Sequence, residues 1–490
     1  MFTRPQLDAF VERLARLLAH VFFRRVEVEG REQIPSGAPL VVIANHHNSL
    51  VDPLLLLATL GVHPRFLAKN TLWELPGIRS LLDLAGAIPV FRRQDEGAAD
   101  EPAGRDAEAR PAQRAEGERS GHLSQNDATF ARCFDELAAG GAVALFPEGV
   151  SHDAPRLAPL KTGAARIVLG AAETRGVTST RILPVGLTFD EKAIFRSRVL
   201  VRIGEPLDPN AWIEIAPRNR HDAARSLTEA MHRALARVTL EYRSEEEATL
   251  LGGASELFTV RERELPARMA LAEAFALRRA VIATVERLRV RDPARVAAAL
   301  VRLRGYAERI EALGLRDDQV AARYPAGEVL AYVVGSAALL LWWLPLAALG
   351  TLFNWIPYRL LGVAAGRAKS RDMPATVKLF GGFFLFPIAW VVWSVLAGLA
   401  LGAGAALGTL FLAPATGWYA MRFQERYEHF LDEAVAYLRV KLRRRKLAAL
   451  RAEREALQDE ISELVRLDAG GDGQGWGEAK PSEAEDDEEH

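Results

Sequence analysis

Cysteine is almost absent from the sequence, because Cys133 is the only one among 490 residues. An intramolecular disulfide is therefore excluded, and the sequence has no group of Cys and His residues at the spacing of a zinc site. Charge of one sign is not in excess either, since 62 Lys and Arg residues balance 63 Asp and Glu residues. With a formal net charge of −1, no overall field draws the protein to nucleic acid, so we expect no nucleic-acid partner.

The N-terminal segment lacks the uninterrupted apolar core of a secretory signal, because Arg4, Asp8 and Glu12 interrupt it. Residues 1–25 instead carry apolar side chains at helical spacing with arginines between them, which predicts an amphipathic helix. Such a helix can pack on a domain or lie on a membrane surface, and its pattern does not discriminate between the two.

Residues 26–209 alternate short apolar strands with helical segments, which predicts an α/β domain. One stretch interrupts the alternation. Residues 94–127 are rich in Ala, Gly, Glu, Arg and Pro and have no apolar periodicity, so we expect a disordered surface insertion there.

The segment Asn45–Pro53, NHHNSLVDP, follows an apolar strand expected at residues 40–44. The carboxyl ends of strands are where α/β sheets collect functional residues. Asp52 and Pro53 are typical of a helix start, so His47 on the preceding loop and Asp52 at the cap could meet. A carboxylate that holds one imidazole nitrogen leaves the other nitrogen available as a base. The alternative is a turn with a capping aspartate and an incidental histidine.

Two further motifs follow expected strands. In FPEGVSHD, residues 146–153, Glu148 can accept hydrogen bonds from hydroxyls, Gly149 permits a tight turn and Ser151 can hydrogen-bond a phosphate. Arg92 follows another strand, where its guanidinium could clamp a dianion. Each residue alone has an ordinary structural explanation, but three such motifs on successive strand ends indicate one site.

Together these segments resemble the four sequence blocks of the glycerolipid acyltransferase family, in chain order. The longer segments FPEGVSHDAPRLAPLKTGAA and FRSRVLVRIGEPL resemble the fungal-type glycerol-3-phosphate/dihydroxyacetone-phosphate acyltransferases. The resemblance implies an α/β fold with a mixed sheet flanked by helices, followed by a helical region and C-terminal membrane helices. The four blocks are residues 45–53, 86–92, 146–149 and 183–187.

The resemblance also implies a catalytic pair. His47 would act as the general base, and Asp52 would fix the tautomer of its imidazole and stabilise the imidazolium. His46 is the alternative base, but its spacing from Asp52 does not match the His-x4-Asp pattern.

The acceptor site is implied in the same way. Arg92 would hold the acceptor phosphate, while Glu148 and Gly149 would line the rest of the acceptor. The third block departs from many lysophosphatidate-acylating members, which have Glu-Gly-Thr-Arg-Ser where this chain has Glu-Gly-Val-Ser. Without that arginine, part of the phosphate contact must come from Lys161 or Arg156.

The implied reaction moves a fatty acyl group from acyl-CoA, or from an acyl carrier protein thioester, to a hydroxyl of glycerol 3-phosphate or dihydroxyacetone phosphate. That is the first step of phosphatidic acid and phospholipid synthesis. No metal or bound cofactor is required, since a thioester is already activated. The alternative acceptor is 1-acylglycerol 3-phosphate (lysophosphatidate). Two alternatives belong to other functional classes. One is a thioesterase that uses water in place of the acceptor, and the other is a membrane scaffold without enzymatic activity.

Residues 210–327 are rich in charged residues and are expected to be mostly helical. Residues 328–421 carry two long apolar stretches. Each stretch exceeds one bilayer span of about 20 residues. We expect two apolar hairpins, bent near Pro345 and near Gly402, because the basic residues on their flanks favour one side, the cytoplasm. The protein would then be an integral membrane protein that contacts membrane lipid, with its catalytic domain facing the cytoplasm.

Residues 422–467 are expected to form a helical or coiled-coil segment, because leucines recur there every seven residues. Arg454 interrupts the leucine seam, and the segment could self-associate through residues 442–466. Residues 468–490 are expected to form an acidic, disordered tail.

Overall fold

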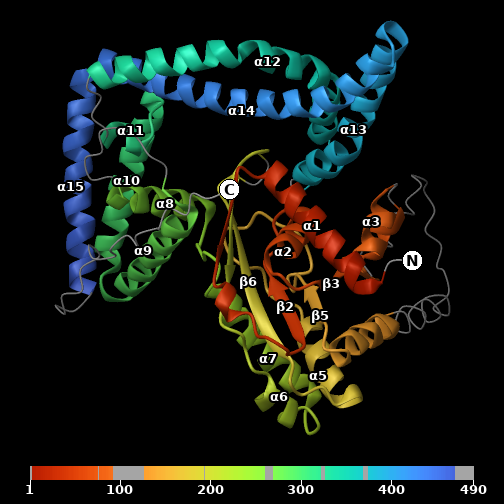
Figure 1. The fold of residues 1–490 in the computed structure, drawn as a ribbon. Coiled ribbons are helices and arrows are strands. Elements are labelled where there is room, and N and C mark those ends of the chain that lie inside the picture. The colour runs from red at the N-terminus through yellow and green to blue at the C-terminus, as the bar shows by residue number, and fades with distance from the viewer. Residues whose placement is uncertain are drawn as a thin grey trace, which may run out of the picture. The chain divides into compact units, whose positions relative to one another are not determined.

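The structure is a computed structural model that describes residues 3–74, 77–91, 126–191, 194–259, 269–321, 326–367 and 373–468. It divides into two compact units (Figure 1). The first unit combines Met1–Glu241 with Leu352–Pro414, and the second combines Tyr242–Thr351 with Ala415–His490. Nearly all of the insertion expected at residues 94–127, and the tail after Asp468, lie outside the described residues.

Seven strands form one sheet in the first unit, in the order β1-β7-β6-β2-β5-β3-β4. Neighbouring strands are parallel except β6 and β7, which are antiparallel, so the prediction of a mixed sheet is confirmed. The carboxyl ends of β2, β5, β6, β3 and β4 therefore share one edge. The strands are β1 (Arg25–Glu29), β2 (Leu40–Ala44), β3 (Pro64–Lys69), β4 (Ile88–Val90), β5 (Ala142–Leu145), β6 (Arg181–Phe189) and β7 (Arg198–Ile203).

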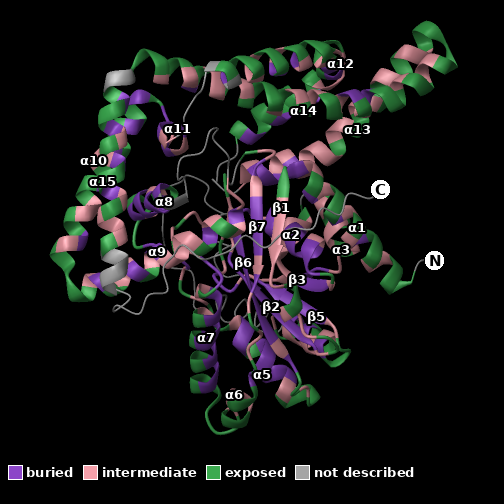
Figure 2. Cartoon of the chain, turned by 60° about the vertical axis from the view of Figure 1, so that its left-hand side comes forward, coloured by how far each residue is buried: buried purple, intermediate pink, exposed green. Residues whose placement is uncertain are grey.

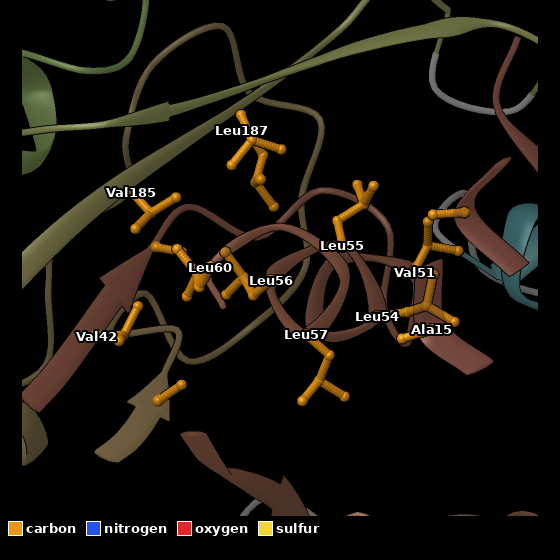
Figure 3. Packing of buried hydrophobic residues seen from close by; sticks show 14 of the residues in the cluster. Ala15, Val42, Val51, Leu54, Leu55, Leu56, Leu57, Leu60, Val185 and Leu187 are labelled. Carbon is orange, nitrogen blue, oxygen red and sulfur yellow. The ribbon is translucent and has the colours of Figure 1, made fainter. Parts of the chain in front are cut away.

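Helices cover both faces of the sheet because β2 is apolar on both sides. Val42 and Ala44 pack in one cluster with α1 (Arg4–Phe22) and α2 (Val51–Thr59), as Figure 3 shows for Val42 and the leucines of α2. Val41 and Ile43 pack in the other cluster, with α5 (Gly163–Arg175), α7 (Arg220–Ala236) and a helix through residues 126–138. A strand buried on both faces is typical of the centre of a parallel sheet.

The amphipathic N-terminal helix packs on the domain. Val11, Ala15, Ala19 and Phe22 are buried on the side of α1 that joins the cluster around α2. Short helices also connect the strands of the first unit: η1 (Arg31–Gln33), η2 (Asn70–Glu74), α3 (Ile78–Leu84) and α6 (Asn210–Ile215).

The boundary expected at residue 209 lies too early. Leu227 and Met231 of α7 are fully buried in the cluster on one face of the sheet. This part of the first unit therefore extends to Glu241, because α6 and α7 complete the cover of that face.

The apolar stretches form three long helices, α12 (Ala326–Gly366), α13 (Met373–Leu401) and α14 (Ala403–Leu442). α12 runs without a break through Pro345, so the hairpin predicted for the first stretch is wrong. Neighbouring side chains and local adjustments can satisfy the backbone around a proline in an apolar helix. The second stretch turns at Gly402, which has φ +90°, and Ser394 on one side donates a hydrogen bond to the Ala406 carbonyl on the other (2.7 Å).

Two of these helices, within the described part of the chain, are long and apolar enough to cross a membrane by length and composition, at Val329–Gly366 and Met373–Leu401. Figure 2 shows mostly exposed and intermediate residues along α12 and α13, in contrast to the buried strands β2 and β5. Large apolar side chains such as Trp342 and Leu399 are each 82% exposed. Apolar surface of this extent is typical of a segment that contacts lipid or another protein.

The second unit is helical, and α15 (Arg444–Asp468) packs within it. Leu447, Leu450 and Leu457 of α15 are buried, so the leucine seam predicted to support self-association is occupied within the chain. Arg454 does not interrupt this seam, because it is buried and donates through Nε and Nη2 to the Asp317 carboxylate. The other helices are α8 (Glu245–Thr259), α9 (Leu271–Arg291), α10 (Pro293–Leu313) and α11 (Asp317–Ala321).

Tyr306 completes that ion pair by donating a hydrogen bond to Asp317 Oδ1 (2.6 Å). Burial and the neighbouring carboxylate raise the pKa of the Tyr306 hydroxyl, so it keeps its proton and remains a donor. A buried carboxylate with three donors is fully compensated, which is the condition for keeping a charge inside a protein.

The fourth sequence block contains a glycine with a packing requirement that can be tested. A Cβ at Gly186 would lie 1.9 Å from the backbone carbonyl oxygen of Val238, which cannot move aside as a flexible side chain could. We expect Gly186→Ala to lower the free energy of unfolding by at least about 1–3 kcal/mol, the usual cost of overpacking a core. Gly163→Ala is the matched control, because a Cβ there meets nothing within 4 Å. Thermal melts of the detergent-solubilised variants measure the difference, and equal melting temperatures would contradict the close approach.

Candidate active site

The loop after β2 begins with a side chain that extends the sheet. Asn45 is buried, and its amide donates to the Leu187 carbonyl (2.9 Å) while its Oδ1 accepts the Leu187 N–H (2.7 Å). The side chain therefore takes the place of a backbone partner for β6 just where β2 ends. This double hydrogen bond fixes the point at which the chain leaves the sheet.

Asp52 is the centre of the loop. It lies fully buried in the first turn of α2, and its Oδ2 accepts three hydrogen bonds. The donors are the backbone N–H groups of His47 (2.7 Å) and Asn48 (2.8 Å) and the Nδ1–H of His46 (2.9 Å). A buried carboxylate requires such donors, so the loop is wrapped around this oxygen.

The predicted contact between the His47 imidazole and Asp52 is wrong, because the imidazole on Asp52 belongs to His46. The physical reason lies in the backbone. His47 gives its main-chain N–H to the carboxylate, and its ring faces elsewhere, whereas the ring of the preceding residue reaches the same oxygen. Counting residues along the chain does not reveal this reversal.

The His46 ring is held by a second contact. It stacks on Phe146 with ring centroids 4.1 Å apart and planes inclined by 12°. Since Nδ1 donates to Asp52, Nε2 is the nitrogen without a proton, and the described part of the chain places no hydrogen-bond partner on it. The His46 side chain is 16% exposed, so part of the ring is accessible from outside.

His47 has a different environment. Its Nδ1–H donates to the His152 carbonyl (2.9 Å), and its ring makes edge contacts with His152 and Phe189. A carbonyl stabilises a protonated imidazole less than a carboxylate does, because only the carboxylate supplies a full opposite charge. The ring that a carboxylate orients is that of His46.

Glu148 joins the two loops of the site. It is buried, and its Oε1 accepts the His46 backbone N–H (3.0 Å), while its Oε2 accepts from His152 Nε2–H and from the Ala158 N–H (2.8 Å). The Ala154 N–H donates to His152 Nδ1 (3.1 Å), which fixes the tautomer with the proton on Nε2. Both carboxylate oxygens of Glu148 are thus committed to the protein, which differs from the expected role as an acceptor for substrate hydroxyls.

Gly149 closes the turn after β5 in a left-handed backbone conformation. Its φ is +79°, and its N–H donates to the Phe146 carbonyl (3.0 Å). A Cβ at this position would lie 2.5 Å from Lys161 Nζ, so the Lys161 ammonium lies directly over the Gly149 backbone. The Lys161 N–H in turn donates to the Pro147 carbonyl (2.7 Å), which holds the lysine beside the turn. The structure thus brings Lys161, Gly149 and the half-buried Ser151 to one loop.

The far end of this loop is fixed by another carboxylate. Glu241 accepts the Leu157 N–H (3.0 Å), and burial raises the pKa of the Glu241 carboxyl group. Arg92, the remaining predicted site residue, lies outside the described residues. No group of three or more His, Cys, Asp or Glu side chains that could hold a metal ion occurs in the part of the chain that the structure describes.

Sequence reasoning missed two members of the site. His152 was not among the predicted site residues, yet its carbonyl and backbone N–H contact His47 and His46. Phe146 was not among them either, although its ring stacks on the His46 imidazole. Their place at a strand end beside the Pro-Glu-Gly turn was the available signal, but it does not identify their partners.

Two family models match the chain. The model described as Acyltransferase matches residues 25–188, which include β1, β2 and the candidate site. The model described as Glycerol-3-phosphate acyltransferase 2 C-terminal domain matches residues 253–468, the region that contains the apolar helices.

Similar proteins occur in two yeasts. An uncharacterized acyltransferase of Schizosaccharomyces pombe is 26% identical over 463 residues, which cover 78% of this chain and 67% of that protein. Glycerol-3-phosphate O-acyltransferase 1 of Saccharomyces cerevisiae is 26% identical over 285 residues, 45% of this chain and 38% of that protein. Glycerol-3-phosphate O-acyltransferase 2 of the same yeast is 42% identical over 82 residues, 17% of this chain and 11% of that protein.

The chain thus aligns with about two thirds of the first relative and with less than half of each of the other two. The two family matches lie in succession on one chain and agree with the resemblance carried by the sequence blocks. The chain thus matches an Acyltransferase model and a glycerol-3-phosphate acyltransferase C-terminal model in succession, and it is similar to the glycerol-3-phosphate acyltransferases of yeast.

Proposed function

We propose that this protein is a membrane-bound O-acyltransferase that moves a fatty acyl group from an acyl thioester to a hydroxyl of glycerol 3-phosphate. The observation that carries the proposal is the His46 imidazole, which the buried Asp52 carboxylate holds by Nδ1 and whose Nε2 has no hydrogen-bond partner among the described residues. Dihydroxyacetone phosphate is the related acceptor, and acyl-CoA or an acyl carrier protein thioester is the donor. The reaction would supply the first acylated intermediate of phospholipid synthesis.

In the proposed mechanism, His46 Nε2 takes the proton from the acceptor hydroxyl as its oxygen attacks the thioester carbonyl carbon. Asp52 keeps the proton on Nδ1 and stabilises the imidazolium that forms. The carbon–sulfur bond then breaks, and the imidazolium returns its proton to the departing thiolate. No serine or cysteine nucleophile is needed, because the acceptor itself attacks.

General-base assistance contributes about 10²–10⁴-fold to such reactions, and holding the two substrates together contributes much of the rest. His47 and Glu148 serve as positioning residues in this proposal. His47 holds the His152 loop against the His46 loop, and Glu148 binds the backbone of one loop and the side chain of the other.

The acceptor phosphate is proposed to bind beside the turn at Gly149. Lys161 is the cation over that turn, and Ser151 lies in the same loop. A lysine is a point charge suited to phosphate, and it would replace the arginine that the third block lacks. Arg92 stays a proposed phosphate ligand on the strength of its sequence block alone.

The choice between the two histidines gives the first test of this mechanism. We expect His46→Ala to lower kcat by about 10²–10⁴-fold, the usual contribution of a general base. His47→Ala is the matched neighbour and should lower kcat by less than about tenfold, since the hydrogen bond from its ring to the His152 carbonyl is a neutral one. Initial rates with labelled acyl-CoA and glycerol 3-phosphate measure both, and thermal melts check that each variant folds. A severe loss in His47→Ala with a mild one in His46→Ala would reverse the assignment.

The acceptor is tested by offering the purified protein labelled acyl-CoA with glycerol 3-phosphate, dihydroxyacetone phosphate and lysophosphatidate in parallel. We expect the highest kcat/KM with one of the first two. A higher kcat/KM for lysophosphatidate would make the protein a 1-acylglycerol-3-phosphate acyltransferase. Release of free fatty acid at the same rate with and without acceptor would make it a thioesterase, and no turnover of any kind would support an inactive scaffold.

Membrane attachment is proposed to place the catalytic unit on the cytoplasmic side. Ala375 and Leu379 in the first turns of α13 belong to the core cluster of the catalytic unit, so that end of the helix is on the side of the sheet. Two basic residues at the C-terminal end of α12 and directly after it, Arg359 and Arg367, favour the cytoplasm.

We expect a cysteine at Gly366, the last residue of α12, to react with a membrane-impermeant maleimide only after cell lysis. The position is exposed, and a Cβ there meets nothing within 4 Å. The unsubstituted protein is the control, because Cys133 is fully buried and burial raises its pKa to about 12. Labelling of Gly366→Cys in intact cells would place this end outside and would leave acyl transfer itself untouched.

A further inference from the structure

The apolar helix α13 contacts the catalytic loop directly. Thr376, in the first turns of α13, accepts a hydrogen bond on Oγ1 from the Leu50 N–H (3.3 Å). Ser49 Oγ–H points to the sulfur of Met373 at 3.9 Å. Leu50 is the N-cap of α2 and stands two residues before Asp52, so α13 holds the segment that connects the two members of the catalytic pair.

The two parts of α13 have different surroundings. Ala375, Thr376 and Leu379 are 1%, 5% and 5% exposed, and Ala375 and Leu379 lie in the same core cluster as Val51. Farther along, the apolar side chains are exposed: Phe384, Ile388, Val391, Val395 and Leu399. One continuous helix therefore begins inside the catalytic unit and continues as a segment with the length and composition of a membrane span.

The loop needs such support because its backbone is strained. Ser49 has φ +43°, a left-handed conformation that costs a residue other than glycine on the order of 1–3 kcal/mol unless its surroundings impose it. The contacts from Met373 and Thr376 fall on this residue and the next one. Without them, the loop can relax, and the His46 ring and Asp52 would no longer be held at 2.9 Å.

We propose that Thr376 is a positioning residue for the acyl transfer reaction, through which the membrane helix α13 holds the catalytic loop in its active conformation. This inference rests on the proposed function, because it assigns Thr376 to the geometry of the His46–Asp52 pair. It also implies that the catalytic loop has a fixed position relative to the bilayer, since the helix that supports it is the one that enters the lipid.

The test compares substitutions that keep or remove the hydroxyl. Thr376→Val has nearly the same shape but cannot accept the Leu50 N–H, so we expect kcat to fall about three- to tenfold, the usual contribution of one hydrogen bond, with little change in the KM for glycerol 3-phosphate. Thr376→Ser keeps the hydroxyl and should restore kcat. Thr351→Val is the matched control, because the Thr351 hydroxyl donates only to the Ala347 carbonyl of its own helix (2.8 Å), and kcat should not change.

A second measurement does not depend on catalysis. Hydrogen–deuterium exchange in the peptide covering residues 45–52 should be faster in Thr376→Val than in the unsubstituted protein, and unchanged in Thr376→Ser and Thr351→Val. Equal exchange in all four proteins, or equal loss of kcat in the Val and Ser variants, overturns the proposal. If the unsubstituted protein transfers no acyl group, the proposed function fails, while the exchange result still decides whether α13 holds the loop.

Discussion

The candidate site depends on the buried carboxylate of Asp52. A charge without exposure to water must be compensated by donors, and here one oxygen collects two backbone N–H groups and one imidazole N–H. The backbone donors bend the loop after β2, and the bend brings the His46 ring to the carboxylate. Most of the other features of the site support this arrangement.

The supports come from three directions. Asn45 fixes the start of the loop to β6, and Glu148 binds the His46 backbone from the turn after β5. Thr376 approaches from the apolar helix and binds the Leu50 N–H. A site held from a neighbouring strand, a neighbouring loop and the apolar helix α13 is preorganised, which is what proton transfer between fixed groups requires.

Much of this arrangement could be predicted from the sequence, and the errors have physical causes. The α/β sheet and the meeting of motifs at its carboxyl edge follow from alternating apolar strands, because parallel strands place their carboxyl ends together. The identity of the paired histidine could not be predicted from spacing, since a short loop with Ser49 at φ +43° reverses which neighbouring ring meets Asp52. The break predicted at Pro345 failed because an apolar helix can absorb a proline. Arg454 was misjudged because its partner Asp317 lies far away in sequence.

The central claim is that His46, oriented by Asp52, is the base that meets the acceptor hydroxyl. An experimental structure of the protein with bound glycerol 3-phosphate tests it most directly, because it locates the hydroxyl relative to both imidazoles. The account predicts a hydroxyl oxygen about 2.6–3.2 Å from His46 Nε2, with His46 Nδ1 on the Asp52 carboxylate. A hydroxyl bound to the His47 ring, or an Asp52 carboxylate paired with that ring, would contradict it.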